Sequence, residues 1–434
     1  MRITLAIIYL FFWSSCCSAQ WQNLNLGLSG AGYDMYYDTT DNLLYVGGFF
    51  DYADNNLVKG IAVWDGQTWD SLGAGTYSFP VYSVTKYNGG IFASGIFKYD
   101  PSYIDSWLAF WNGQKWDTLP ERVNSSIKVF KEYNGELYFG GAFERIGQNH
   151  ANLLAKYDGT SFTALSVPSE GGGFQVLAIE FYQGQMYIGG NFYDTLTGVN
   201  DLERWNGSAF EPFGGISPGF GASIVSAMVI HKNELYIAGS FNVASGFPSN
   251  NIVRWDGHQF KDVGGGTNDQ IKKMYVFNDE IYVSGYFSMA GNVPANMLAK
   301  WDGQQWSEVC HGNYNNIITD FIVVGNDLYV TGGFTMIDSV PISYIGKYAN
   351  IISVPEIEQI QFTLSPNPAS DHVSVSSQVD ISRLRVLDLQ GRLIHAAAIR
   401  GREYTLSIRD LSPGIYLFEV ETEAGRMVRN LAKE

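Results

Sequence analysis

A short motif repeated at a nearly constant interval constrains the fold of this chain more than any other feature. Tyr45-Val-Gly-Gly-Phe-Phe50 is followed fourteen residues later by Trp64-Asp-Gly and then by Trp69. Copies of the six-residue motif occupy residues 45–50, 92–97, 138–143, 187–192, 236–241, 282–287 and 329–334, and their closing phenylalanines are 46 to 49 residues apart. Such an interval indicates a repeat architecture, in which each unit buries its apolar face against the next.

Each repeat predicts four strands. In the second repeat these are residues 81–87, 91–97, 107–111 and 115–119, where apolar residues alternate with polar ones. Turns such as Asn88-Gly-Gly join the first two strands, and turns such as Asp65-Gly-Gln and Asn112-Gly-Gln join the last two. Asn-Gly and Asp-Gly indicate hairpins because these turns need positive φ angles. Four antiparallel strands per repeat predict a seven-bladed β-propeller.

The Asp and Asn residues of these turns could also form a repeated metal or sugar site. We interpret them as turn formers, because no second acidic residue recurs at a fixed distance from them. The paired glycines are interpreted as points of close backbone approach between blades. Once residues 1–19 are removed, Cys310 is the one cysteine of the chain, and we expect a packed side chain there. We expect no metal, no cofactor and no catalytic residue.

The last repeat predicts how the ring closes. It ends at Tyr348-Ala-Asn350 and lacks a fourth strand, whereas Trp21-Gln-Asn-Leu-Asn-Leu-Gly27 matches Trp69-Asp-Ser-Leu-Gly73 of the first repeat. We therefore expect the N-terminal segment to complete the seventh blade and to cover an edge that would otherwise remain open.

Loop lengths predict which face of the ring binds a ligand. The connections between blades, and the loops from the second to the third strand, emerge on one face and vary in length, whereas tight hairpins occupy the other face. The longer loops are the candidate binding surface. Their candidate ligand-contacting residues are Asp51, Tyr52, Asp54, Tyr99, Asp100, Tyr103, His150, Asp194 and Asp201.

Charge and the N-terminus bear on location and partners. The formal net charge is -16, and about -15 of it belongs to residues 20–350, which disfavours a nucleic-acid partner. Residues 1–19 have the pattern of a secretory signal peptide: Arg2, an apolar run, and small residues before Gln20. We expect no membrane span in the mature chain, because no later apolar run is long enough.

The repeats resemble the kelch-like and galactose-oxidase-like propellers, and more closely the exported bacterial propellers with YVGGxF and WDGxxW motifs. The resemblance covers residues 20–350 and implies a fold, but it implies no activity. The copper site of galactose oxidase needs clustered His, Tyr and Cys ligands, whereas the histidines of this region are scattered at positions 150, 231, 258 and 311.

Residues 351–359 are an acidic, proline-containing linker, and residues 360–434 predict a small Ig-like β-sandwich of seven short strands. These residues contain Leu364-Ser-Pro-Asn-Pro-Ala-Ser-Asp371, Leu387-Asp-Leu-Gln-Gly-Arg392 and Leu411-Ser-Pro-Gly-Ile-Tyr-Leu417, in that order. This pattern resembles the C-terminal (type A) sorting domain of type IX secretion cargo. The resemblance implies that residues 360–434 engage the type IX secretion machinery, and that the protein is secreted or attached to the outer-membrane surface.

Three functions remain open from the sequence. The first is a secreted or cell-surface binding or adhesion protein that recognises a glycan or a protein. The second is an exported polysaccharide-degrading lyase or hydrolase built on the propeller, because a fold does not determine an activity. The third is a structural component of the cell surface. We favour the first, because no nucleophile–base pair and no metal-ligand spacing emerges from the repeats.

Overall fold

The computed structural model describes residues 21–73, 80–97, 106–117, 119, 121–168, 174–193, 200–211, 213, 215–217, 223–310, 312–351, 362–389, 391–422 and 425–434. These residues form strands and turns and include no helix. The chain divides into two compact units at residues 351 and 352. Each unit is described by itself.

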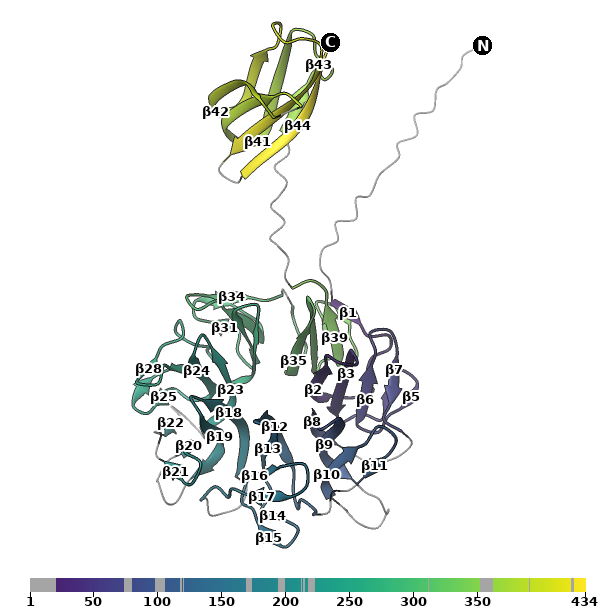
Figure 1. Ribbon diagram of the computed structural model, residues 1–434, viewed down its shortest axis with the longest axis vertical. Coiled ribbons are helices and arrows are strands. Elements are labelled where there is room, and N and C mark those ends of the chain that lie inside the picture. The colour runs from purple at the N-terminus through teal and green to yellow at the C-terminus, as the bar shows by residue number, and fades with distance from the viewer. Residues whose placement is uncertain are drawn as a thin grey trace. The chain divides into compact units, whose positions relative to one another are not determined.

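The described part of the first unit contains seven four-stranded antiparallel sheets, together with smaller sheets in its loops. The innermost strand of each sheet contacts the innermost strand of the next, and β35 of the seventh sheet contacts β2 of the first. Figure 1 shows the sheets arranged around a ring with these strands toward its centre. The sheets are the blades of a β-propeller, as the repeats predict, and we number them 1 to 7 from the blade that contains β2.

The strands of each blade follow one another from the centre of the ring outward. The innermost strands are β2 (Gly32–Asp38), β8 (Val81–Tyr87), β12 (Ile127–Tyr133), β18 (Gln175–Tyr182), β23 (Ile224–His231), β29 (Ile271–Phe277) and β35 (Ile318–Val324). The second strands contain the repeated motif and are β3 (Leu43–Gly48), β9 (Gly90–Phe97), β13 (Glu136–Gly141), β19 (Gln185–Tyr193), β24 (Glu234–Ser240), β30 (Glu280–Gly285) and β36 (Asp327–Gly332).

The two outer layers contain the repeated tryptophans and their aromatic equivalents. The third strands are β6 (Ile61–Trp64), β10 (Ser106–Trp111), β16 (Leu154–Tyr157), β20 (Asn200–Trp205), β27 (Ile252–Trp255), β33 (Leu298–Trp301) and β39 (Ile345–Tyr348). The outermost strands are β7 (Trp69–Ser71), β11 (Trp116–Asp117), β17 (Phe162–Ala164), β21 (Phe210–Glu211), β28 (Phe260–Lys261), β34 (Trp306–Glu308) and β1 (Trp21–Asn23).

The N-terminal strand closes the ring, as the incomplete seventh repeat predicts. β1 pairs antiparallel with β39, and Trp21 lies opposite Tyr348. The Trp21 ring is buried, in edge-on contact with Tyr314 and Tyr348 at 5.6 and 5.2 Å between ring centroids. The pairing gives β39 a partner on its outer edge, so the last blade does not end in an open strand.

Contacts between neighbouring blades explain why the motif contains glycine and tryptophan. A Cβ atom on Gly47 would lie 2.7 Å from Cγ1 of Val81 in the next blade, which is too close for any side chain. A Cβ atom on Gly48 would instead meet the backbone of its own blade, 2.3 Å from the carbonyl oxygen of Ala31. The Trp69 indole donates a hydrogen bond of 2.9 Å to the carbonyl of Leu24, which follows the outermost strand of the preceding blade.

The Asp and Asn residues of the outer hairpins form the turns themselves. In six blades the side-chain oxygen of this residue accepts hydrogen bonds from the backbone N–H groups two and three residues later, as Asp65 does from Gln67 and Thr68 at 2.7 and 2.6 Å. The following glycine has a φ of 95–104° in all six. Hydrogen bonds from Ser161 and Thr160 hold the pKa of Asp158 well below its ordinary value. These residues therefore stabilise the backbone of the turns, in agreement with our interpretation of the sequence.

The second unit contains five strands, where the sequence predicts seven shorter ones. They are β40 (Phe362–Ser365), β41 (His372–Leu387), β42 (Leu393–Ser407), β43 (Gly414–Thr422) and β44 (Gly425–Lys433). β41 and β42 each join two of the predicted strands, because a bulge between Ser376 and Ile381 bends the pair without ending it. One part of β41 pairs with β40 and the other with β43, and side chains from both parts meet in one core.

The closure predicts a large effect of one N-terminal side chain on stability. Trp21→Ala should lower the free energy of unfolding by about 3–5 kcal/mol, because it removes a buried aromatic ring from the last blade. Gln22→Ala changes an exposed side chain of the same strand and should stay within about 0.5 kcal/mol. Urea unfolding followed by tryptophan fluorescence and circular dichroism measures both. Equal stability of the two variants would contradict closure by β1.

Candidate functional site

Two sets of loops lie on one face of the propeller, which we call the longer-looped face. They are the loops between the second and third strands and the connections from one blade to the next. The two sets are joined by backbone bridges in four blades, Leu28 with Ala53, Val123 with Ile146, Thr267 with Ala290, and Tyr314 with Ile337. In blade 5, β22 (Ile216–Ser217) pairs with β25 (Val243–Ala244), which in turn pairs with β26 (Phe247–Pro248).

Short hairpins shape the loops of this face. They are β4 (Tyr52–Ala53) with β5 (Asn56–Leu57), β14 (Arg145–Ile146) with β15 (Asn149–His150), β31 (Met289–Ala290) with β32 (Val293–Pro294), and β37 (Met336–Ile337) with β38 (Val340–Pro341). One polar side chain in the preceding connection fixes each hairpin. Asn268, for example, accepts hydrogen bonds of 2.9 Å from the backbone N–H groups of Ser288 and Met289.

The same hydrogen-bonding arrangement recurs in other blades, and the predictions from the sequence do not include it. Asn124 and Asn315 make equivalent pairs of hydrogen bonds with their own loops, and the Ser29 hydroxyl accepts from the N–H groups of Asp51 and Tyr52. The sequence signal in these four blades is an Asn or Ser three residues before the start of the innermost strand. Because these loops are fixed to the blades, the described loops of blades 1, 3, 6 and 7 form a preformed part of the longer-looped face.

The structure distributes the sequence-predicted contact residues over several blades and does not gather them into one site. Asp51 pairs with Lys59 at 2.9 Å, and Asp54 accepts a hydrogen bond of 2.7 Å from the N–H of Leu26. Tyr52 is 47% exposed in the same loop of blade 1. His150 is exposed on β15 of blade 3. Tyr99, Asp100, Tyr103 and Asp194 lie outside the described residues.

Asp201 differs from the exposed loop residue that the sequence suggests, because it is buried on β20. It accepts a hydrogen bond of 2.7 Å from the N–H of Phe192 and another from the Ser223 hydroxyl. Burial raises the pKa of Asp201 to about 6, although these hydrogen bonds oppose the shift. One carboxylate oxygen therefore binds the backbone of blade 4, and the other binds a side chain just before the innermost strand of blade 5.

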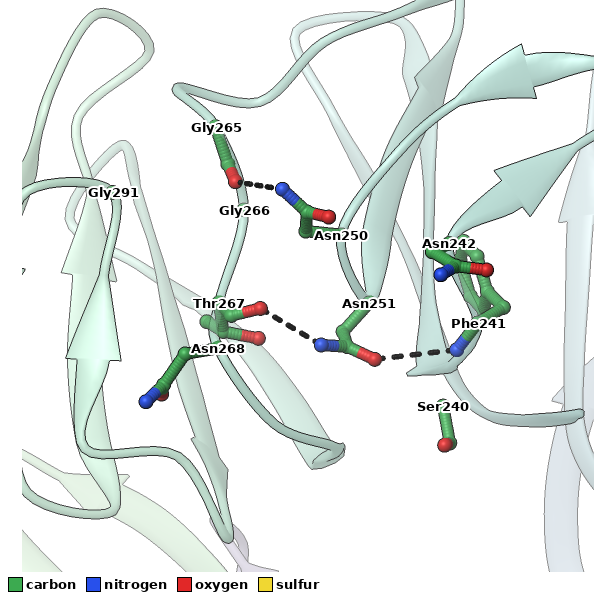
Figure 2. Close-up of a pocket in the computed structure, with 10 residues that line it drawn as sticks. All are labelled: Ser240, Phe241, Asn242, Asn250, Asn251, Gly265, Gly266, Thr267, Asn268 and Gly291. Carbon is green, nitrogen blue, oxygen red and sulfur yellow. Dashed lines mark hydrogen bonds between the residues drawn. The ribbon is translucent and has the colours of Figure 1, made fainter. Parts of the chain in front are cut away.

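A pocket opens on the longer-looped face between blades 5 and 6, with a volume of about 390 Å³ (Figure 2). Its lining comes from four segments and contains no charged side chain: Ser240, Phe241, Asn242, Asn250, Asn251, Gly265, Gly266, Thr267, Asn268 and Gly291. Two asparagines hold the walls. Asn251 donates to the carbonyl of Thr267 at 2.8 Å and accepts from the N–H of Phe241 at 3.2 Å, and Asn250 donates to the carbonyl of Gly265 at 2.9 Å.

Other polar groups of this pocket remain free for a ligand. Among the described residues, the Asn242 amide and the Ser240 hydroxyl have no side-chain hydrogen bond, and Asn242 is exposed. The pocket thus offers a donor and an acceptor from one amide, together with a hydroxyl, on a fixed backbone. The sequence signal that could have found it is three asparagines within ten residues, at positions 242, 250 and 251, beside the run Gly264-Gly-Gly.

A second cavity, of about 720 Å³, is the central channel between the innermost strands. Inside it, the Lys273 ammonium lies 2.8 Å from Asp34 and 3.5 Å from Asp320. Burial alone would lower the pKa of Lys273, but the carboxylates of Asp320 and Asp34 outweigh it and raise that pKa. Burial raises the pKa of Asp320, and Lys273 opposes that shift.

The four oxygens of this carboxylate pair all have partners within the protein. Asp34 accepts hydrogen bonds from the Ser83 hydroxyl and from the N–H of Val84 in blade 2. Asp320 accepts from the N–H of Met35 in blade 1 and from its neighbour in sequence. The cluster thereby joins blades 1, 2, 6 and 7 across the channel, and its carboxylates have structural roles.

Two further findings concern metals and membranes. In the part of the chain that the structure describes, no group of three or more His, Cys, Asp or Glu side chains has the geometry of a metal site. Cys310 is buried, and burial raises the pKa of its thiol. Within the same residues, no helix has the length and hydropathy of a membrane span.

Comparison with known families identifies the second unit. Residues 363–434 match the family described as the secretion system C-terminal sorting domain. The chain is a type IX secretion substrate. Proteins with this domain are exported and are then attached to the cell surface or released from it. No curated protein matches the chain in sequence.

Solved structures resemble the chain at low sequence identity. PorZ of Porphyromonas gingivalis, described as an essential bacterial surface component of the type IX secretion system, is 12% identical with a TM-score of 0.47, over 93% of this chain and 59% of its own. The chain thus spans less than two thirds of that protein. The β-propeller domain of Swd1 from Myceliophteria thermophila is 10% identical with a TM-score of 0.39, over 74% of this chain and 97% of its own. GH43B of a Bacteroides ovatus xyloglucan locus is 11% identical with a TM-score of 0.27, over 93% and 90%.

The buried carboxylate of Asp201 predicts an unusual pH dependence of stability. Its folded-state pKa of about 6 lies above the value of about 3.9 in an unfolded chain, so between these values the folded state holds a proton that the unfolded state has lost. Asp201 therefore stabilises the fold less as the pH rises through this window. Asp201→Asn should remove this pH dependence. Between pH 4 and pH 7, the free energy of unfolding of the variant should therefore rise by on the order of 1–3 kcal/mol relative to that of the parent. Urea unfolding of both proteins across this range measures it, and a constant difference between them would contradict the prediction.

Proposed function

We propose that this protein is an exported carbohydrate-binding protein of the bacterial surface, and that its propeller binds ligand on the longer-looped face. The observation that supports this proposal most is the amide-lined pocket between blades 5 and 6. A neutral saccharide offers many hydroxyl groups, each both donor and acceptor, and no charge. Free amide and hydroxyl groups without neighbouring charges complement such a ligand.

The organisation of the chain is part of the same proposal. Residues 1–19 would be a signal peptide, residues 20–350 a propeller of the kelch-like, galactose-oxidase-like kind, residues 351–359 a linker and residues 360–434 the sorting domain. In this organisation the sorting domain acts during export, and the propeller acts outside the cell. A preformed face with loops fixed by Asn124, Asn268 and Asn315 suits recognition, because little ordering is needed when a ligand binds.

The binding proposal predicts a specific loss of affinity. The secreted protein should bind one or more neutral oligosaccharides on a glycan array, and Asn242→Ala should weaken that binding about tenfold because it removes an amide donor and acceptor. Ser240→Ala should weaken it further. Isothermal titration calorimetry with the best array hit measures the change.

Asn55→Ala is the matched control, since it removes an exposed amide from the equivalent loop of blade 1. It should leave the affinity unchanged. Thermal unfolding should be the same for the parent, the Asn242 variant and the control, because Asn242 makes no side-chain hydrogen bond among the described residues. Affinity for neutral saccharides that survives both pocket substitutions would place the site elsewhere, and the absence of any such binding would contradict the proposal.

The sorting domain predicts where a truncated chain accumulates. Removal of residues 360–434 should leave a folded propeller, because the blades bury cores of their own, but the protein should remain in the periplasm. Fractionation of a type IX-competent host, with immunoblotting and limited proteolysis, measures location and folding. A periplasmic reporter fused to residues 351–434 is the converse control and should reach the cell surface or the medium. A truncated chain in the medium would overturn this role.

A further inference from the structure

Among the described residues, two lysines of the central channel have no acidic partner, and they occupy equivalent positions in two blades. Lys128 is the second residue of β12 in blade 3, and Lys272 is the second residue of β29 in blade 6. In every blade the register of the innermost strand shifts at this residue, which marks a β-bulge. Because the bulge follows the connection from the preceding blade, both lysines lie at the end of the channel that opens on the longer-looped face. We call this end the channel mouth.

The other lysines that line the channel are paired. Lys86 contacts Asp38 and Asp41, Lys131 contacts Glu180 at 2.6 Å, and Lys273 contacts Asp34 at 2.8 Å. Among the described residues, no carboxylate pairs with Lys128 or Lys272. Burial lowers the pKa of Lys128 to about 8, and it also lowers the pKa of Lys272. Desolvating an ammonium group without a counter-ion costs free energy, so these positions are candidates for contact with an anionic ligand.

Aromatic rings lie beside Lys128. Tyr33 stacks on Tyr82 at 6.0 Å between centroids with an interplanar angle of 9°, and Tyr82 stacks on Trp107 at 6.3 Å and 18°. We call these three residues the aromatic stack. The Lys128 ammonium lies 3.5 Å from the centre of the Tyr82 ring. Across the ring, the Lys272 ammonium lies 5.5 Å from the centre of Tyr286, whose side chain is 47% exposed.

A ligand that satisfies both features has anionic groups and flat apolar faces. Carboxylates would pair with the two ammonium groups, and the C–H face of a pyranose ring packs on an aromatic ring. A densely charged polyanion is less suitable, because residues 20–350 have a net charge of about -15. An oligosaccharide with one charge per sugar ring and no other charged group is compatible with this net charge. Lys128 and Lys272 line the channel cavity, whose volume of about 720 Å³ lies within the range of small-ligand sites, and the aromatic stack lies outside that lining, beside Lys128.

We propose that the channel mouth binds a carboxylate-bearing saccharide, whose carboxylates contact Lys128 and Lys272 and whose sugar rings pack on the aromatic stack. This site is separate from the pocket between blades 5 and 6 and does not depend on it. Its ligand class also differs, since that pocket contains no charged side chain.

The proposal predicts discrimination between two forms of one ligand. Tetragalacturonate or tetramannuronate should bind the secreted protein, and the methyl ester of the same oligosaccharide should bind at least about tenfold more weakly, because esterification removes the charge and keeps the rings. Lys128→Met and Lys272→Met should each reduce affinity for the acid about tenfold. Lys115→Met removes the same charge from the opposite face, where Lys115 is 70% exposed, and should have no effect. Isothermal titration calorimetry at constant ionic strength measures all of these affinities.

The pH dependence gives a second readout that does not depend on removing a side chain. Burial causes the shift in the pKa of Lys128. Of the titratable groups on the neighbouring strands, Tyr82 on β8 faces the ammonium, whereas Lys86 of β8 and Glu180 of β18 have other partners. β9 has no titratable side chain, and Glu136 and Tyr138 of β13 bond to each other. The ammonium is charged below about pH 8 and loses its charge above it, whereas the ligand carboxylates stay charged. Affinity should therefore fall between pH 7 and pH 9, with proton uptake on binding near pH 8. Lys128→Arg should keep the affinity and remove both effects, because an arginine stays charged throughout this range.

Several results would overturn the proposal. They are equal affinity for the acid and its methyl ester, equal affinity for a tetraglutamate peptide, unchanged affinity in Lys128→Met and Lys272→Met, or no binding of either uronate at millimolar concentration. Thermal unfolding shows whether the methionine variants are folded, and Lys128→Arg tests the site if they are not. Asn242→Ala should leave uronate binding intact, so a failure here is distinct from a failure of the neutral-saccharide proposal.

Discussion

The antiparallel pairing of β1 with β39 closes the ring, and the other features of the propeller depend on that closure. A closed ring holds seven innermost strands around one channel, so that side chains distant in sequence meet there. Lys273 can contact both Asp34 and Asp320 because blade 7, which the N-terminus completes, stands next to blade 1. Without β1, the outer edge of β39 would be open to pairing with other chains.

The blades share one backbone arrangement, and their functional differences lie in side chains that are not needed to maintain that arrangement. Glycines, tryptophans and turn residues are required for close packing and for hairpins, as the contacts of Gly47 with Val81 and of Trp69 with Leu24 show. At the bulge position, by contrast, Ser226 and Thr319 bond to the backbone of the next blade, whereas Lys128 and Lys272 have no acidic partner among the described residues. The free positions are therefore the ones at which a ligand can be recognised.

The candidate site was less predictable than the fold. Loop length predicts a binding surface on the longer-looped face, and its acidic and aromatic residues are candidates because such residues are common ligand contacts. Asp54 and Asp201 are instead occupied by backbone N–H groups, and Asp51 pairs with Lys59. The pocket between blades 5 and 6 uses Asn242 and Ser240, and its sequence signal is a cluster of asparagines beside a run of glycines, which predicts loops as readily as a binding site. A side chain's partners are set by neighbouring loops, and spacing along the chain does not reveal them.

The sequence by itself determined the repeat, the four strands of each blade, the closure by the N-terminal segment and the sorting domain. Each of these follows from local patterns: alternation of apolar residues, positive-φ turns, and motifs in a fixed order. Only the tertiary structure decided that two of the predicted strands continue into one within β41, because the bend is a bulge whose pairing partner lies elsewhere in the chain. It also decided that Asp201 is buried and that Lys128 is desolvated beside an aromatic ring. Burial and electrostatic environment depend on what the closed ring brings together, and no stretch of sequence contains that information.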